Sequence, residues 1–279
     1  MVRPAPHTDA PAAAMQLTRP RVMGLGTHHK TGTVWMQRVF RSMGRAFDIP
    51  CAQVFRKTAA ELVPDAGRIF LFSWSTRFHE SILARPDTRI MHIIRDPRDV
   101  LISGMRYHQI CGAFGENAIH MKRDDLGGQS YQEHIRGLPD DEAKLLFEMG
   151  ERHARTIGEM VAWDYTRPNV IELRYEDLMQ DHDAVAFTLH LRALGLTARE
   201  AGEGGKIFWR KSLFGGLARD KKRDDRIKTH VTSGEIAQWR TALPRRVAEI
   251  YAERHGRDLV TLGYEPHPTN WLRELRHAA

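Results

Sequence analysis

The segment GLGTHHKTGTVW, Gly24–Trp35, is the most informative stretch of this chain for its fold, because it joins a strand-like run to a helix-like run. Its beginning overlaps the run RVMGLGT, Arg21–Thr27, which is typical of a short buried strand that leads into a turn. Its end begins the run TVWMQRVFRSMG, Thr33–Gly44. This run places Val34 or Trp35, Val39, Phe40 and Met43 on roughly one helical face, with Gly44 as the expected end of the helix. A strand, a loop and a helix in this order present unpaired backbone amides at the positive end of the helix dipole. The segment therefore predicts an anion site.

The loop resembles a phosphate-binding P-loop, G-x-x-x-x-G-K-[ST], without fully matching it. Gly24 and Lys30 fit the frame, but His29 stands where the second glycine belongs. Three interpretations are open at this point: an altered ATP site, a plain turn with a solvated lysine, and a loop for another anion.

Four residues give this loop its chemistry. Lys30 adds a mobile full charge, and Thr31 and Thr33 add hydroxyl donors. Gly32 permits a backbone conformation that other residues adopt with strain. The position between a strand and a helix favours an anion site over a plain turn.

The rest of the chain alternates strand-like and helix-like segments. Strands are expected at 68–73 and 89–94, and the segment NVIELRYEDL, 169–178, is expected to be a strand that runs into a helix. Further helices are expected at 97–108, 139–165 and 244–256. This alternation predicts one α/β domain, residues 21–279, built on a single doubly wound parallel sheet with helices on both faces. Residues 1–20 are expected to form a disordered tail, residues 111–129 a lid, and residues 203–231 a long surface loop.

Composition narrows the class of partner. The net charge of +7 and the isoelectric point near 9.6 favour an anionic partner. Cys51 and Cys111 are the two cysteines in the sequence, so no disulfide framework is expected and a reducing compartment fits best. The longest apolar runs are too short to span a bilayer, so we expect a cytoplasmic protein without a membrane partner.

The segment RDPRD, Arg95–Asp99, follows the third expected strand. Asp96 has the position of a metal-organising acid of an NTPase, but arginines flank it and would disfavour a dication. Two guanidinium groups suit a phosphate instead. Pro97 makes Asp96 a good helix cap, and a cap and a phosphate clamp can share one turn.

At these residues the sequence resembles the sulfotransferases that use 3′-phosphoadenosine 5′-phosphosulfate (PAPS). The first signature of that family is a loop like HHKTGTVW, and the resemblance implies that this loop holds the 5′-phosphosulfate. The implied contact residues are His29, Lys30, Thr31, Gly32, Thr33, Val34 and Trp35.

Three further signatures follow in the family's order. Arg95 and Ser103 match the pair that holds the 3′-phosphate, and Tyr175, in YEDL, matches a tyrosine that helps to seat the adenine. The fourth signature, R-K-G followed by G-D-W, departs from the family pattern, because Thr232, Ser233 and Gly234 stand where R-K-G is expected. Arg210 and Lys211, or the basic run at 219–226, are candidates to supply the missing charge.

The resemblance implies an in-line transfer of a sulfuryl group from PAPS to a hydroxyl of a small-molecule acceptor, a phenol or an alcohol, without a metal. Lys30 would neutralise the charge that grows on the leaving phosphate. Family members place a histidine base on the segment that here reads FLFSWSTRFHES. The candidates for the base are His79 and His108, with His28 and His29 in the loop as further options.

Two other functional classes are alternatives to a sulfotransferase. A small-molecule kinase would need ATP and Mg²⁺, and a catalytically silent relative would bind the nucleotide without transferring a group. No stretch interleaves basic and stacking aromatic residues, so no nucleic-acid partner is expected. A homodimer is one option for the assembly. The residues that could line the acceptor pocket by position are Trp74, Phe78, His79, Tyr107, Phe114 and Met121.

Overall fold

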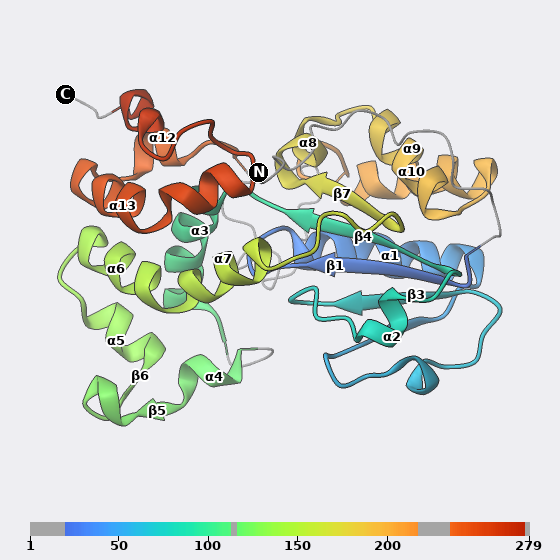
Figure 1. Ribbon diagram of the computed structural model, residues 1–279, viewed down its shortest axis with the longest axis horizontal. Coiled ribbons are helices and arrows are strands. Elements are labelled where there is room, and N and C mark those ends of the chain that lie inside the picture. Colours follow the sequence, from blue (N-terminus) through green and yellow to red (C-terminus); the bar gives the residue numbers. More distant parts are fainter. Residues whose placement is uncertain (1–19, 113–115, 217–234, 277–279) are drawn as a thin grey trace. The chain divides into compact units, whose positions relative to one another are not determined.

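The computed structural model describes residues 20–112, 116–216 and 235–276, and their contacts form two compact units. The sheet unit contains the described residues 20–95 and 162–216, and the helical unit contains the described residues 96–161 and 235–276. Figure 1 labels the elements of both units. The expected tail, 1–20, lies outside the described residues except for Pro20. The assignment of 21–279 to a single domain stays a prediction.

Five parallel strands form the sheet, in the order β2-β3-β1-β4-β7. The elements of the sheet unit are β1 (Val22–Thr27), α1 (Thr33–Phe47), β2 (Cys51–Gln53), η1 (Ala60–Leu62), β3 (Ile69–Ser73), α2 (Glu80–Leu83), β4 (Thr88–Ile94), β7 (Val170–Arg174), α8 (Tyr175–Gln180), α9 (Val185–Leu194) and α10 (Ala198–Lys211). The chain places β3 on one side of β1 and β4 on the other, so the strand order reverses beside β1. The predicted doubly wound parallel sheet is confirmed, and its reversal point is where such sheets bind ligands.

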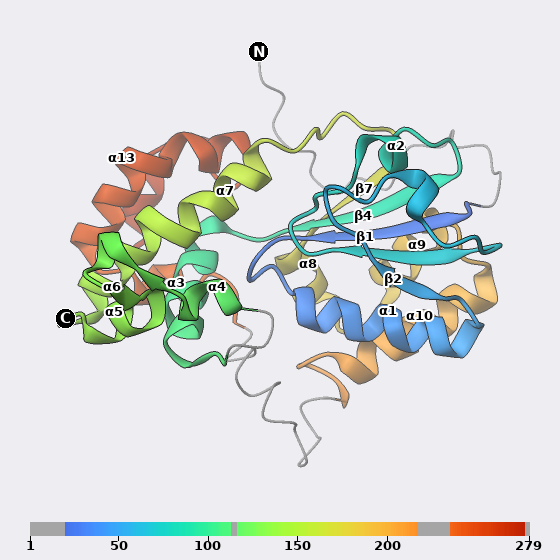
Figure 2. The same cartoon turned by 90° about the horizontal axis from the view of Figure 1, so that it is seen from below.

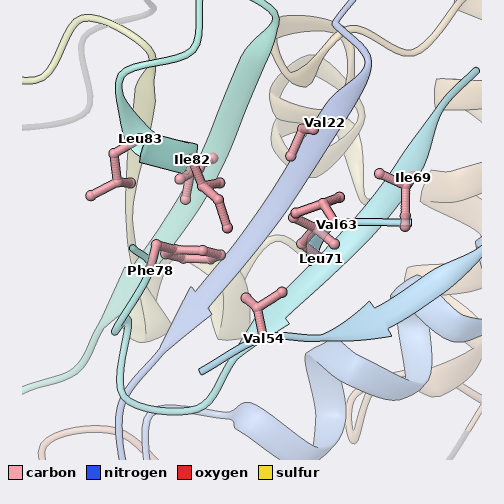
Figure 3. Close-up of a cluster of buried hydrophobic side chains, with 9 residues drawn as sticks. Val22, Val54, Val63, Ile69, Leu71, Phe78, Ile82 and Leu83 are labelled. Atoms are coloured by element: carbon pink, nitrogen blue, oxygen red, sulfur yellow. The ribbon is translucent and has the colours of Figure 1, made fainter. Parts of the chain in front are cut away.

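Helices cover both faces of this sheet. Figure 2 shows α1, α9 and α10 along one face and α2 on the other. A cluster of buried hydrophobic side chains joins α2 to the sheet (Figure 3), and its labelled members are Val22, Val54, Val63, Ile69, Leu71, Phe78, Ile82 and Leu83. Phe78 is 6% exposed and packs in this core. It is therefore a core residue rather than the pocket residue suggested by its position in the sequence.

Helix α1 begins where expected and runs one turn further. It extends to Phe47, and Asp48 caps it in the left-handed region, at φ 53°, with its amide bonded to the Gly44 carbonyl. The expected end at Gly44 is therefore wrong. Val39, Phe40 and Met43 are buried, as their helical spacing predicts.

Helix α10 occupies the start of the segment expected to be a long loop. Thr197 and Glu200 form a reciprocal capping box at its beginning, and the helix continues to Lys211. Gly204 and Gly205 are buried against α9, where a Cβ would lie 2.4 Å from Leu191 and 2.3 Å from Thr188. The glycines therefore permit close helix packing here, and the prediction of a loop from residue 203 is wrong for residues 203–211.

The helical unit is built around α3. Its elements are α3 (Pro97–Ile110), α4 (Asn117–His120), β5 (Lys122–Arg123), η2 (Asp124–Leu126), β6 (Gln129–Ser130), α5 (Tyr131–Gly137), α6 (Asp141–Glu148), η3 (Met149–His153), α7 (Ala154–Val161), α12 (Trp239–Ala242), α13 (Arg245–Thr261) and η5 (Asn270–Glu274). A π-helical segment, η3, links α6 to α7. The amphipathic helix expected from 139 onward is therefore present, although its register shifts at η3.

Asp96 and Arg98 tie the start of α3 to the rest of the helical unit. Asp96 caps α3 through the amide of Arg98, with Pro97 in the first turn. The Arg98 guanidinium also pairs with Asp96 and with Glu265, at 2.8 Å and 2.6 Å. It lies 3.7 Å from the ring centroid of Trp239. Asp96 is thus a cap, as predicted, whereas Arg98 is 2% exposed and bound to carboxylates, so its predicted phosphate contact is wrong.

Within the described residues, none of the helices combines the length and the apolar character that crossing a bilayer requires.

Candidate nucleotide site

The loop between β1 and α1 has an unusual backbone. Lys30 and Gly32 have positive φ angles of 63° and 92°. Gly32 is the N-cap of α1, and since glycine has no side chain, the N-cap supplies no oxygen to the first amides of the helix. The first turn also contains no acidic residue. The positive end of α1 is therefore directed at the loop without a competing side-chain anion at its cap.

The backbone of His28 organises this loop. Its amide donates to the Thr31 hydroxyl at 2.9 Å, and its carbonyl accepts from the hydroxyls of Thr31 and Thr33 at 3.0 Å and 2.9 Å. The Thr31 amide also points to this carbonyl, at 3.2 Å. Both threonine hydroxyls therefore shape the backbone of the loop. Their contact with an anion stays a prediction.

Arg95 lies beside the loop. It directly follows β4 and is 5% exposed, and its Nη1 donates to the carbonyl of Lys30 at 3.2 Å. The guanidinium carbon lies 4.4 Å from the ring centroid of Tyr175. A Cβ on Gly32 would lie 3.1 Å from the Tyr175 ring. The structure thus brings together Lys30, Gly32, Arg95 and Tyr175, which belong to three separate sequence signatures.

Trp35 forms an aromatic wall next to this group. Its ring is edge-on to Tyr175, at 6.2 Å between centroids, and lies 5.1 Å from Phe208 of α10. Within the described residues its buried Nε1 has no hydrogen-bond partner. His29, Lys30 and Val34 are half-buried. The implied contact residues 29–35 therefore follow the end of β1 and are half-buried except for Thr31, which is buried.

His79, the first candidate base, has a structural role in the sheet unit. It is the N-cap of α2, and its Nδ1 lies 3.2 Å from the Ser81 amide and 2.8 Å from the Ser81 hydroxyl. Trp74, which follows β3, is 42% exposed. His79 as a catalytic base stays a prediction.

Ser103 and His108, on α3, belong to the helical unit. Ser103 is half-buried. His108 is 1% exposed, and its Nδ1 lies 2.7 Å from Glu148, which also accepts from the Tyr131 hydroxyl at 2.6 Å. Burial and the Glu148 carboxylate raise the pKa of Tyr131. The 3′-phosphate role of Ser103 and the base role of His108 stay predictions.

Several predicted residues lie outside the described part of the chain: Thr232, Ser233, Gly234, the run 219–226 and Phe114. Arg210 and Lys211, the candidates for the missing charge, are described in the last turn of α10. Arg210 pairs with Glu203 at 3.0 Å, so this guanidinium has an acidic partner in its own helix.

Sequence reasoning missed a polar chain beneath the loop. His92 lies in β4 with Gly26 of β1 on one side and Glu172 of β7 on the other. Its Nε2 is 2.8 Å from Nε2 of His28, and its Nδ1 is 2.5 Å from a carboxylate oxygen of Glu172. Trp163 donates to the other carboxylate oxygen at 2.8 Å. The sequence signals that could have indicated this polar chain are the polar residues inside two apolar runs, His92 in RIMHII and Glu172 in VIEL.

Thr76 adds a hydroxyl group to this polar series, and Gly26 leaves space for it. The Thr76 hydroxyl lies 3.2 Å from Nε2 of His28 and 3.2 Å from the carbonyl of Thr27. A Cβ on Gly26 would lie 2.7 Å from the Thr76 methyl group. Glycine at position 26 therefore makes room for the contact between Thr76 and the loop.

Within the residues that the structure describes, no group of three or more histidine, cysteine, aspartate or glutamate side chains is arranged to hold a metal ion.

The sulfotransferase domain family matches residues 22–190, more than half of the chain, from β1 through the phosphate loop and Arg95 to Tyr175 and α9. No curated protein matches the chain.

Two solved structures are similar in fold. Mouse sulfotransferase SULT7A1 complexed with PAP is 15% identical with a TM-score of 0.50, over 87% of this chain and 84% of that chain. Retinol dehydratase in complex with androsterone and inactive cofactor PAP is 12% identical with a TM-score of 0.48, over 87% of this chain and 82% of that chain. Because the family model matches more than half of the chain, the chain belongs to the sulfotransferase domain family.

Proposed function

We propose that this chain transfers a sulfuryl group from PAPS to a hydroxyl of a small-molecule acceptor. The observation that carries the proposal is the meeting of the Lys30 carbonyl, Arg95, Gly32 and Tyr175 where β1 and β4 end. In a doubly wound sheet, this reversal point is the expected place for a nucleotide.

The residues present fit a nucleotide with two phosphate groups. The amides at the start of α1 and the ammonium of Lys30 suit one anionic end. Arg95 is a guanidinium held against an aromatic ring, a geometry that favours planar contacts with anions. Trp35 and Tyr175 offer aromatic surfaces, and the buried Nε1 of Trp35 is a donor that a bound polar group would satisfy. The PAP-bound state of mouse SULT7A1, a protein of the same fold, supports this choice of nucleotide.

The chain's own residues account for the charge that the transfer creates. PAPS supplies the sulfuryl group, and its adenosine bisphosphate portion is the leaving group. Lys30 and the positive end of α1 stabilise negative charge on the leaving 5′-phosphate. Arg95 binds at a distance from the sulfur and orients the reacting end. A sulfuryl group carries less charge than a terminal phosphoryl group, so a lysine cation is sufficient and Mg²⁺ is not required.

The acceptor proposed is a small hydroxylated molecule with an aromatic or apolar body. Trp74 and Phe55 are 42% and 64% exposed and follow the neighbouring strands β3 and β2. Because both strands are parallel to β1, these rings lie at the same edge of the sheet as the loop. Exposed aromatic rings beside a transfer site favour a phenol or an apolar alcohol over a charged glycan.

A transfer assay tests this function. The purified chain is incubated with sulfur-labelled PAPS and a panel of phenols and alcohols in the presence of EDTA, and sulfated products are separated and counted. We expect acceptor-dependent product that EDTA does not reduce. Product that appears with ATP and Mg²⁺ instead would identify a kinase, and PAP binding without product from any acceptor would indicate a silent relative.

A further inference from the structure

A buried polar chain runs from the sheet edge to the phosphate loop, and its members are Glu172, His92 and His28. Both imidazoles are fully buried, at 0% exposure, whereas the Glu172 side chain is 16% exposed. The chain crosses three adjacent strands, because Gly26, His92 and Glu172 are neighbours in the strand register. Burying these polar groups is costly unless each hydrogen bond is made.

The groups at the two ends of this polar chain of side chains determine which ring nitrogens carry hydrogen. At the loop end, the Thr76 hydroxyl donates its hydrogen to the Thr27 carbonyl, so toward His28 the same oxygen can act as an acceptor. At the sheet-edge end, the Glu172 carboxylate is an acceptor, and the Trp163 indole can only donate to it.

These ends are consistent with one arrangement of two neutral imidazoles. His28 carries its hydrogen on Nε2 and donates to Nε2 of His92, 2.8 Å away, with the Thr76 oxygen as a second acceptor at 3.2 Å. His92 then carries its hydrogen on Nδ1 and donates to Glu172. The carboxylate therefore sets the tautomer of His92, and His92 sets the tautomer of His28.

The tautomer of His28 affects the anion site because the backbone of His28 organises the loop. Its carbonyl accepts from both Thr31 and Thr33, and its amide donates to Thr31. Hydrogen bonds that fix the His28 ring therefore also fix the turn that carries Lys30. We propose that Glu172, His92 and His28 form a positioning relay that fixes the shape of the phosphate loop for nucleotide binding.

Glu172→Gln tests the relay with almost no change in shape. Since the Trp163 indole can only donate, the new amide turns its oxygen toward Trp163 and its NH₂ group toward Nδ1 of His92. His92 must then carry its hydrogen on Nε2, and because His92 sets the tautomer of His28, the hydrogen of His28 moves from Nε2 to Nδ1. The bond between the imidazoles reverses its direction, and the single hydrogen of the Thr76 hydroxyl can then serve either the Thr27 carbonyl or Nε2 of His28, but not both. One hydrogen bond next to the loop is lost, and we expect the affinity for adenosine 3′,5′-bisphosphate to fall about tenfold, the scale of one buried unsatisfied polar group.

A second substitution restores the relay. With Trp163→Phe added to Glu172→Gln, the indole donor is removed and the amide can turn its oxygen toward His92. His92 regains its Nδ1 hydrogen, and we expect the double variant to bind the bisphosphate more tightly than Glu172→Gln alone. Simple structural damage would make the double variant weaker than either single variant. Glu61→Gln, an exposed glutamate of the same unit, is the control.

The direct readout is ¹⁵N NMR of histidine-labelled protein without ligand, which reports the tautomer of each ring. We expect Nδ1–H for His92 and Nε2–H for His28 in the wild type, and Nε2–H for His92 in Glu172→Gln. Nε2–H for His92 in the wild type, or no rescue by Trp163→Phe in calorimetric titration, would overturn the relay. The affinity argument rests on the proposed function, whereas the tautomers do not. Wild-type protein that fails to bind the bisphosphate but shows these tautomers would refute the function and leave the hydrogen assignment standing.

Discussion

Lys30 lies in a turn in which the hydroxyls of Thr31 and Thr33 donate to the His28 carbonyl, and its own carbonyl accepts from Arg95. A cation in this loop lies next to the positive end of α1, so both act on the same anionic group. The sequence indicated the loop, because a lysine and a glycine between a strand and a helix form a local pattern. The sequence did not reveal that the threonine hydroxyls turn inward, since this depends on the backbone of His28.

Lys30→Ala tests the proposed role of the Lys30 ammonium in the transfer step. If Lys30 neutralises the leaving phosphate, kcat falls at least about a hundredfold, on the scale of losing one transition-state donor. Steady-state sulfuryl transfer measures the effect, and Lys57→Ala, an exposed lysine of the sheet unit, is the control. Turnover within a few-fold of wild type would remove Lys30 from this role.

Arg95→Ala tests the nucleotide contact. Loss of a hydrogen bond to a charged group weakens binding of adenosine 3′,5′-bisphosphate by about 1.5–3 kcal/mol. Calorimetric titration measures the change, with Arg56→Ala, an exposed arginine, as the control. An unchanged affinity in Arg95→Ala would contradict the assignment.

His92 and Glu172 show why part of the site could not be predicted. Each stands alone in an apolar run, and a single polar residue in such a run is compatible with many surroundings. Their contact joins residues 80 positions apart and depends on the register of β4 with β7. The sequence predicts both strands but does not specify their register.

At the scale of elements, α10 is the clearest failure of sequence reasoning. Glycine-rich sequence favours a loop by local propensity, but α9 packs closely against this helix where Gly204 and Gly205 have no side chains. Tertiary packing therefore decides the structure of residues 203–211. The apolar runs of β1, β3 and β4 had no such conflict between local and tertiary preferences, and their prediction is confirmed.

Two glycines of α10 give a matched test. A Cβ on Gly204 would lie 2.4 Å from Leu191 and 2.9 Å from Met43, whereas a Cβ on Gly202 would meet nothing within 4 Å. We expect Gly204→Ala to lower the free energy of unfolding by about 1–3 kcal/mol through overpacking. Gly202→Ala should raise it by about 0.5–1 kcal/mol through helix propensity. Urea unfolding followed by circular dichroism measures both, and equal effects of the two substitutions would refute the packing argument.

At the scale of the whole molecule, ion pairs between distant segments make stability depend on pH. Arg68 pairs with Glu200 across 132 residues of sequence. This contact, reinforced by the capping bonds to Thr197, lowers the pKa of Glu200 to about 2. The unfolded value is about 4.3, so the stabilisation is complete above that pH and is lost as the pH falls toward about 2.

Glu200→Gln checks this linkage. The difference in unfolding free energy between wild type and variant should be larger at pH 7 than at pH 3, because at pH 3 part of the linkage has already been lost. Urea titrations at the two pH values give the difference. A gap that stays constant or grows toward pH 3 would show that the carboxylate charge of Glu200 does not stabilise the fold.

The overall architecture was predictable because a parallel sheet depends on a few long apolar strands separated by helices. Strand β2, three residues long, was missed, since three residues carry too little pattern to be recognised. The two anionic ends of the proposed nucleotide were inferred from signatures about 70 residues apart. The contact between Arg95 and the Lys30 carbonyl now joins those signatures within the sheet unit.

The most direct test of the account is a calorimetric titration of the full chain with adenosine 3′,5′-bisphosphate in EDTA, compared with 5′-AMP and with ATP plus Mg²⁺. We predict one site per chain and the tightest binding for the bisphosphate, with affinity reduced in Arg95→Ala. Absence of bisphosphate binding, or tighter binding of ATP that requires Mg²⁺, would contradict it.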